Sequence, residues 1–490
     1  MKQDRRDFLR RSGCALGMTA LATQFRHFGL MSALAQKAID DGDSSAPTDY
    51  RAMVCIFMNG GNDGNNSVIP LHNSVTVSNY QQYHDLRHPY GLAIPQNIAL
   101  PIAVPRLGNL TYGLHPAFGA GPFSNGLYEL WGQNKMAFVT NIGALVKPTT
   151  KEQYEQFAHP KPYGLYSHID QATQQQSGRS DRQIFSGWGG RISDQRSAAD
   201  NPGALVPMIT SIAGAQLFTA GQTTLSMAIP PAPMGLDVVL KPQGYDAFPD
   251  SQAQLNALNL LRTIDLNSEL NAAASHVTSQ AMTVNNSLQS YQEISVEFPP
   301  SGLGNQLKQV ARLIKKRNDL NVKRQIFFVQ INGFDTHRQQ VSTHNTLLAQ
   351  TSQAMRCFYD EMVVQGIADK VTQFTISDFG RTMNPAGTGT SVGSDHAWGN
   401  HLFVVGGISA ADFYGGNTSN GTPFPTLACG GPDDADSGSG SRGRWIPSTS
   451  IEQYAATLAK WFGLPDAALP AVFPNIGNFP NSNLGFMGPA

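Results

Sequence analysis

The feature of this sequence that most limits its possible folds is a series of short segments that are largely apolar without alternation. They span residues 52–58, 135–140, 325–331, 371–376 and 402–405. A strand with one face in water alternates apolar and polar residues, whereas a strand buried on both faces has a continuous apolar run. The segments therefore predict the buried strands of a mostly parallel sheet.

Helical patterns lie between these segments. Residues 303–316 and 346–363 carry apolar side chains at helical spacing, which predicts helices with one buried face. Near the end of the chain, Thr449 and Glu452 have the spacing of a capping box that begins a helix, and this helix is expected to end at Phe462. Strands that alternate with helices predict an α/β fold with helices on both faces of the sheet.

The first 35 residues predict a twin-arginine signal peptide. An arginine pair at 5–6 precedes Phe-Leu at 8–9, a mildly apolar run follows at 13–22, and the Ala-x-Ala sequence at 33–35 fits a cleavage site. A basic amphipathic helix is the alternative, but it explains neither the Phe-Leu position nor the small-residue exit. We therefore expect the twin-arginine translocase to carry the folded chain to the periplasm or out of the cell.

The rest of the chain is expected to form one domain. Residues 36–50 make a polar leader, and residues 51–490 are predicted to be a single α/β domain. Within it, residues 251–300 predict a helical insertion, because their first forty positions are rich in Gln, Asn, Ser and Ala. Residues 421–443, rich in Gly, Ser and Asp, predict a mobile surface loop.

Charge and cysteine content disfavour several classes of partner. The formal net charge is −1 with no basic stretch, which argues against nucleic acid. No apolar run after the signal peptide is long enough to span a membrane. The cysteines of the mature chain are Cys55, Cys357 and Cys429, whose odd number and wide spacing argue against a disulfide framework and a thiolate metal site. Cys55 and Cys357 are expected in the core.

Acidic and histidine residues follow or flank the predicted strands. They are Asp63 after the first strand, Asp335 and His337 after residues 325–331, and Asp378 after residues 371–376. Asp395, His396 and His401 lie shortly before the last predicted strand, residues 402–405. Because ligands of an open parallel sheet bind outside the carboxyl ends of its strands, we expect these side chains at one edge. Carboxylates and imidazoles without thiolates suit zinc, manganese, magnesium or calcium. Paired ions of this kind support phosphoryl or sulfuryl transfer.

Each of these residues also has a structural explanation. Asp63 lies in a glycine-rich turn, where aspartate is common. Asp378 can orient a loop and pair with Arg381, and His337 can be a hydrogen-bonded structural histidine. Their joint occurrence at strand ends still favours a polar active site.

Seven segments resemble a known bacterial family. They are FMNGGNDG at 57–64, LHPA at 114–117, SHIDQ at 167–171, GFDTH at 333–337, SDFGRT at 377–382, DH at 395–396 and GRWIP at 443–447. They resemble domain-of-unknown-function family 1501, which is assigned to the alkaline phosphatase and sulfatase superfamily and often carries twin-arginine signals. The segments occur in order over nearly the whole mature chain, so the resemblance is specific.

The resemblance implies a doubly wound sheet and a site for one or two divalent ions. Asp63 then resembles the superfamily ligand after the first strand, and Asp335 with His337 resembles a later ligand pair. Asp378 resembles the aspartate of an Asp-His-Gly motif, but Phe379 stands where that motif has histidine.

That departure leaves one metal position dependent on other histidines. His396 or His401 would have to replace the missing ligand, or Asp395 with His396 would match the motif instead. The superfamily also has a nucleophile at the start of a helix, for which Ser167 is the candidate. Ser167 is equally placed to be a helix cap, which is the commoner use of serine there.

The function implied is hydrolysis of a phosphate or sulfate ester of a small molecule or polysaccharide by an exported metal enzyme. Arg381 would neutralise charge on the substrate, and His115 and His168 would be supporting groups in the site or core histidines. The alternative is an exported binding or assembly scaffold that keeps the fold without activity.

Overall fold

The computed structural model describes residues 46–224, 226–238, 247–264 and 266–489. The predicted signal peptide, residues 1–35, and most of the polar leader lie outside these residues. Among the described residues, no helix combines the length and apolar character needed to cross a bilayer.

The core of the fold is a nine-stranded sheet in the order β11-β5-β10-β9-β1-β8-β6-β7, with β12 beside β5. Its strands are β1 (Arg51–Asn59), β5 (Met136–Gly143), β6 (Ile209–Ser211), β7 (Met227–Ala228), β8 (Arg324–Asn332), β9 (Val371–Ser377), β10 (Asn400–Val405), β11 (Phe413–Tyr414) and β12 (Thr449–Ser450). All five strands expected from the sequence are present. A small antiparallel sheet contains β2 (Val68–Pro70), β4 (Leu110–Leu114) and β3 (Leu100–Val104).

The strand directions explain where the polar side chains gather. β1 lies between β8 and β9 and is parallel to both. β10 is antiparallel to β9 and to β5. The start of β10 therefore lies at the same edge as the carboxyl ends of β1, β8 and β9. For this reason the residues that precede β10 can meet residues that follow the other strands.

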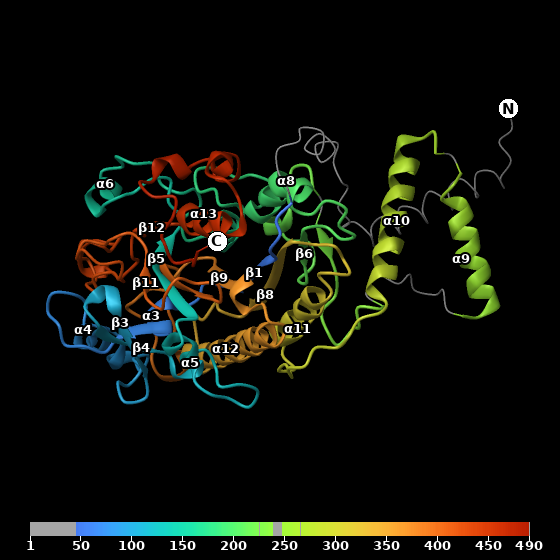
Figure 1. The fold of residues 1–490 in the computed structure, drawn as a ribbon. Helices are drawn as coiled ribbons and strands as arrows, with labels where there is room; N and C mark the ends of the chain where they lie inside the picture. The colour runs from blue at the N-terminus through green and yellow to red at the C-terminus, as the bar shows by residue number, and fades with distance from the viewer. Residues whose placement is uncertain (1–45, 225, 239–246, 265, 490) are drawn as a thin grey trace.

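Helices cover both faces of the sheet, as Figure 1 shows. α11 (Gly302–Lys315) and α12 (Gln340–Val364) cover one face, and α8 (Trp188–Asp200) and α13 (Ile451–Phe462) cover the other. Alternate residues of β1 divide between the two cores: Val54 and Ile56 face α11 and α12, whereas Cys55 and Phe57 face the opposite core. The α/β fold with a mostly parallel sheet is confirmed.

The helices agree with the sequence patterns except near their ends. α11 begins and ends one residue earlier than the predicted segment, and α12 begins six residues earlier than expected. The capping box of α13 is formed by Ser450 and Gln453, one residue later than the predicted pair. Glu452 is consequently buried in the first turn instead of capping it. The physical reason is that Thr449 belongs to β12 and pairs with β5.

The remaining helices are mostly short. They are α3 (Gly64–Ser67), α4 (Tyr80–Arg87), α5 (Tyr128–Gly132), α6 (Lys151–Glu155), α7 (His168–Ser177), α9 (Pro249–Leu261), α10 (Glu269–Leu288) and α14 (Leu469–Val472). α10 falls in the predicted insertion, α9 begins two residues before it, and both stand at one side of the molecule in Figure 1.

Two further sequence expectations concern the loop 421–443 and the cysteines. The hydroxyls of Thr140 and Ser78 donate to the carbonyls of Pro423 and Pro425 in this loop, at 2.6 and 2.8 Å, so part of the loop is tied to the domain. Its mobility stays a prediction. Cys55 and Cys357 are buried free thiols, as expected.

Candidate functional site

Three imidazoles meet at the carboxylate of Asp335, just beyond the carboxyl end of β8. The Nε2 atoms of His168, His337 and His396 lie 3.4, 3.1 and 3.7 Å from its Oδ1 atom. The Nε2 atoms of His337 and His396 are 3.0 Å apart. We call these four residues the His–Asp cluster. Three separate segments supply it: the first turn of α7, the loop after β8, and the loop before β10.

Each imidazole has an acceptor at its other ring nitrogen. Nδ1 of His168 lies 2.6 Å from Oδ2 of Asp378, and Nδ1 of His337 lies 3.1 Å from Oδ1 of Asp395. Nδ1 of His396 lies 2.8 Å from the carbonyl oxygen of Tyr166, which can only accept. These acceptors place the proton on Nδ1 and direct the lone pair of Nε2 into the cluster. Metal-binding histidines are held in this way.

The cluster contains an orphaned acceptor that fits a cation. Nε2 of His168 is buried and has no hydrogen-bond partner among the described residues. Its 3.4 Å approach to Asp335 is an ion-pair distance without hydrogen-bond geometry. Leaving such an atom unpaired costs roughly 1–3 kcal/mol. A divalent ion accepts this lone pair together with the neighbouring imidazole and carboxylate donors.

Within the described residues, His168, Asp335 and His396 are the one group of acidic, cysteine or histidine side chains gathered closely enough to hold a metal ion. Their ligand atoms all lie within 4.8 Å of one another. His337 joins them through its short contacts to two of the three. The described part of the chain thus offers a place for one ion.

The charges of the cluster follow from its neighbours. The hydrogen bond to Asp378 raises the pKa of His168, so protons and metal compete for this imidazole. Burial lowers the pKa of His396 and keeps it neutral. Burial alone would raise the pKa of Asp335, but the hydrogen bond and charge of Arg381 outweigh it and lower that pKa. Asp335 is therefore a carboxylate.

Phe379 has a structural role instead of a ligand role. Its buried ring packs against His168 and His396, with ring centroids 4.7 and 4.6 Å apart. His396 lies against this ring and belongs to the cluster. The apolar ring then fixes the orientation of two imidazoles.

Arg381 is fully buried and already paired. It donates to Oδ1 of Asp335 at 2.5 Å, to the carbonyl of Ser394 at 2.9 Å and to the carbonyl of Gly61 at 3.0 Å. The expected contact with a substrate is therefore not what the structure shows. Arg381 holds Asp335 in place, because its guanidinium is surrounded by acceptors of the protein.

The turn after β1 brings its backbone against the cluster. Gly60 has φ +114, and its N–H donates to Oδ1 of Asp378 at 3.1 Å. A Cβ atom at this position would lie 2.4 Å from the backbone nitrogen of Asp335. Only glycine fits so close to another backbone at this φ.

Gly60→Ala is expected to lower the free energy of unfolding by about 1–3 kcal/mol, because strain at positive φ adds to the clash with Asp335. Gly91→Ala is the matched control. Gly91 also has positive φ, +76, but a Cβ atom there meets nothing within 4 Å. Denaturant unfolding of both variants separates the clash from the backbone strain. Equal losses in the two variants would contradict this close approach.

Asp63 is not brought into the cluster. Arg87, at the end of α4, donates to both of its oxygens, at 2.6 and 3.0 Å. Gln340 donates to Oδ2 at 2.5 Å. Both partners are buried with it. Asp63 does follow the first strand as expected, but its oxygens are engaged, which corrects the expectation that it reaches a cation.

His401 also lies apart from the cluster. Its Nδ1 accepts the backbone N–H of Asn141 at 3.1 Å, and its ring stacks on Phe424. Asp378 and Asp395 lie beside the cluster and orient His168 and His337. The sequence grouped these residues correctly at one edge, although the two aspartates hold imidazoles instead of standing among the closest donor atoms.

Ser167 is the N-cap of α7, since its side chain accepts the backbone N–H of Asp170 at 3.4 Å. His115 lines a separate pocket. His168 was expected as a supporting group, and its place among the donors was missed. The sequence feature that could have indicated this role is the position of His168 directly after a capping serine, at the start of a helix.

Comparison with known proteins agrees with the sequence motifs. The family model described as "Protein of unknown function (DUF1501)" matches residues 162–422, which include the whole His–Asp cluster. The chain belongs to this family. No curated protein sequence matches it.

Two solved structures match this DUF1501 protein at low sequence identity. The PsFucS1 sulfatase from Pseudoalteromonas sp. is 8% identical with a TM-score of 0.32, and the match covers 94% of this chain and 75% of that one. The lipoteichoic acid synthase LtaP from Listeria monocytogenes is 6% identical with a TM-score of 0.24, over 71% and 62%. At these scores the likeness assigns no chemistry, so the functional argument rests on the cluster.

Proposed function

We propose that this DUF1501 protein is an exported metal-dependent hydrolase in which the His–Asp cluster holds one divalent ion, and that its substrate is an ester of phosphoric or sulfuric acid. The observation that carries the proposal is the convergence of three Nε2 lone pairs on one carboxylate oxygen. The two imidazoles and one carboxylate of His168, His396 and Asp335 suit zinc better than magnesium or calcium, which prefer oxygen ligands, and three protein ligands leave one coordination position open. Such an ion supplies Lewis-acid polarisation of the ester.

The charges around the cluster favour an anionic substrate. Asp335 and His337 are 49% and 43% exposed in their side chains, so the cluster is open on this side. Arg442 contacts Asp395 at the same opening and is partly exposed, and Arg338 follows His337 on the surface. Guanidinium groups bind phosphate and sulfate oxygens well and attract anions to an opening.

The capping role of Ser167 favours water over serine as the attacking group. In the proposed reaction the water oxygen bonds to the phosphorus or sulfur, and the bond from that atom to the ester oxygen breaks. One proton of the water ends on the leaving alcohol. His337 is not among the three proposed metal ligands, so its Nε2 lone pair, oriented by the contact of Nδ1 with Asp395, is the group best placed to accept that proton first.

The metal site is tested by measuring zinc bound to the purified full-length protein. We expect about one zinc per chain and loss of binding in His168→Ala. Asp378→Asn keeps the ligands but weakens the orientation of His168, so we expect zinc affinity to fall about 10–100-fold. His88→Ala, which removes an exposed histidine of another region, is the matched control and should bind as wild type. Wild-type protein without stoichiometric metal would contradict the site.

Activity is measured separately with p-nitrophenyl phosphate and p-nitrophenyl sulfate. Hydrolysis of either ester by the zinc-loaded protein, lost in His168→Ala, is the expected result. A zinc-loaded protein that cleaves neither ester would instead favour the binding scaffold, since the metal would then have a structural role.

A further inference from the structure

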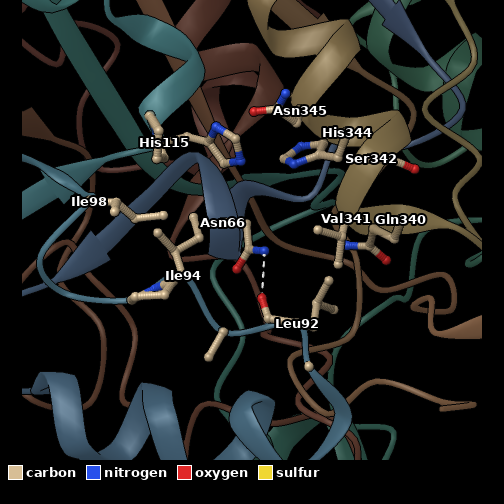
Figure 2. Close-up of a pocket in the computed structure, with 14 residues that line it drawn as sticks. Asn66, Leu92, Ile94, Ile98, His115, Gln340, Val341, Ser342, His344 and Asn345 are labelled. Atoms are coloured by element: carbon tan, nitrogen blue, oxygen red, sulfur yellow. Dashed lines mark hydrogen bonds between the residues drawn. The ribbon is translucent and has the colours of Figure 1, made fainter. Parts of the chain in front are cut away.

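A second site lies between the start of α12 and the segment that follows α4. It is a cavity of about 270 Å³, lined mainly by apolar residues that include Leu92, Ile94, Ile98 and Val341. Figure 2 shows His115 and His344 opposite one another at its top, with Ile98 and Val341 on its two sides. Ile98 and Val341 are 50% and 52% exposed, so the cavity opens to solvent between them. None of the residues of the His–Asp cluster lines it.

His344 leaves a buried acceptor at this cavity. Its side chain is almost fully buried, and Nε2 lies 2.9 Å from Oδ1 of Asn62. Nδ2 of Asn62 donates to Ser67 at 3.0 Å, which directs the amide oxygen toward His344. The proton of the imidazole is therefore on Nε2, and Nδ1 is an acceptor. Among the described residues, Nδ1 has no hydrogen-bond partner.

The buried amides beside His344 are satisfied, which singles out this nitrogen. Asn66 accepts from Tyr83 and Arg87 and donates to the carbonyl of Leu92. Gln340 donates to Asp63 and accepts from Ser394. Buried polar groups are normally paired, and an unpaired one in a cavity marks the place of a missing donor.

His115 presents the complementary group. Its Nδ1 accepts the backbone N–H of Ala117 at 3.0 Å, so its proton is on Nε2 and can be donated. The rings of His115 and His344 are perpendicular, with centroids 5.5 Å apart. Burial lowers the pKa of both imidazoles to about 3, so neither carries charge near neutral pH. The buried Asp63 and Arg87 nearby neutralise one another.

We propose that this cavity binds a small uncharged molecule with an apolar body and a hydroxyl group, and that the hydroxyl donates its hydrogen bond to Nδ1 of His344. The apolar walls receive the body of the ligand, and the hydroxyl supplies the donor that the protein lacks. His115 offers a donor to the same molecule. An anion finds no cationic partner on these walls, and a pure hydrocarbon leaves Nδ1 unpaired. The volume is near the lower end for ligand sites, so the ligand has about the size of one ring.

Phenol, toluene and benzoate test this proposal as probes of equal ring size. The full-length protein is labelled with 15N-histidine, and the Nδ1 resonance of His344, assigned with His344→Phe, is followed during titration. We expect phenol to shift this resonance saturably, and toluene and benzoate to bind at least about fivefold more weakly, because neither can donate to Nδ1. Equal binding of toluene and phenol would overturn the proposal, since the cavity would then be merely apolar.

Ile98→Trp tests the place of binding without touching the buried histidines. The indole fills the opening, so phenol affinity should fall at least tenfold. Ile264→Trp replaces an isoleucine that is similarly exposed, 46%, in another region, and should bind phenol as wild type. Unchanged phenol affinity in Ile98→Trp, at an unchanged melting temperature, would place binding elsewhere and overturn the proposal. Zinc content of the His–Asp cluster should be unaffected, so the two sites fail independently.

Discussion

Replacing Arg87 by methionine is expected to lower the free energy of unfolding by about 3–5 kcal/mol, because it leaves the carboxylate of Asp63 buried without its partner. Both side chains have no exposure to solvent. Arg87 also donates to Asn66 and to the carbonyls of Thr382 and Met383. These acceptors lose their donor together with Asp63. Denaturant unfolding followed by circular dichroism measures the loss.

A surface ion pair provides the matched control. Lys135 and Asp369 lie 2.8 Å apart but remain in contact with water. Lys135→Met should therefore cost less than about 1 kcal/mol. In the double variant Asp63→Leu with Arg87→Met, removal of both charges should restore part of the stability lost in Arg87→Met alone. If Arg87→Met costs no more than Lys135→Met, the pair is not the buried anchor described above.

The second large effect is expected at Glu452, whose replacement by glutamine should stabilise the protein at alkaline pH. Glu452 is fully buried in the first turn of α13, and neither oxygen has a hydrogen-bond partner among the described residues. Burial raises the pKa of Glu452 from 4.5 to about 8, and the nearby polar groups of Asn475 and Ser450 offset only part of this effect. The folded protein thus keeps this carboxyl protonated at neutral pH.

The direction of the pH dependence follows from the two protonation states. Below pH 4.5 the carboxyl is protonated in both folded and unfolded chains, and the full stability is present. As the pH rises toward 8, the unfolded chain ionises while the folded chain does not, so stability falls, and above 8 the loss levels off. The whole difference is roughly 5 kcal/mol.

Unfolding free energies of wild type and Glu452→Gln between pH 5 and pH 9 measure this effect. The two proteins should be nearly equal at pH 5 and diverge as the pH rises, with the variant more stable. Glu152→Gln, at an exposed position of α6, should follow wild type throughout. Parallel curves for Glu452→Gln and wild type would show that the carboxyl is solvated or paired.

Local patterns were sufficient for five strands of the nine-stranded sheet, but not for β6, β7, β11, β12 or the small antiparallel sheet. The five apolar segments became β1, β5, β8, β9 and β10, since a strand buried on both faces must be apolar on both faces. The helical segments were predicted from apolar side chains at helical spacing, because each helix buries one of its faces. The direction of β10 was not readable from its residues, because an apolar run has the same composition in either direction.

The candidate site was predicted in part. Asp335, His337 and His396 were expected at the sheet edge, and they meet there. Asp63 and His401 were expected beside them and instead have partners inside the protein. The end of a strand determines at which edge of the sheet a side chain lies. Residues from other segments determine which of its polar atoms already have a hydrogen-bond or ion-pair partner.

The amino-acid sequence by itself determined the α/β architecture, the family and the edge of the sheet where polar groups gather, because periodicity and short motifs are local properties. Only the tertiary structure decided that His168 joins the cluster, that Arg87 forms an ion pair with Asp63, and that Phe379 orients two imidazoles. Those pairings bring together residues separated by 17 to 228 positions, and their geometry depends on how α4, α7 and the loop before β10 pack. A lone pair is available to a ligand only when no donor or cation of the folded chain is already bound to it.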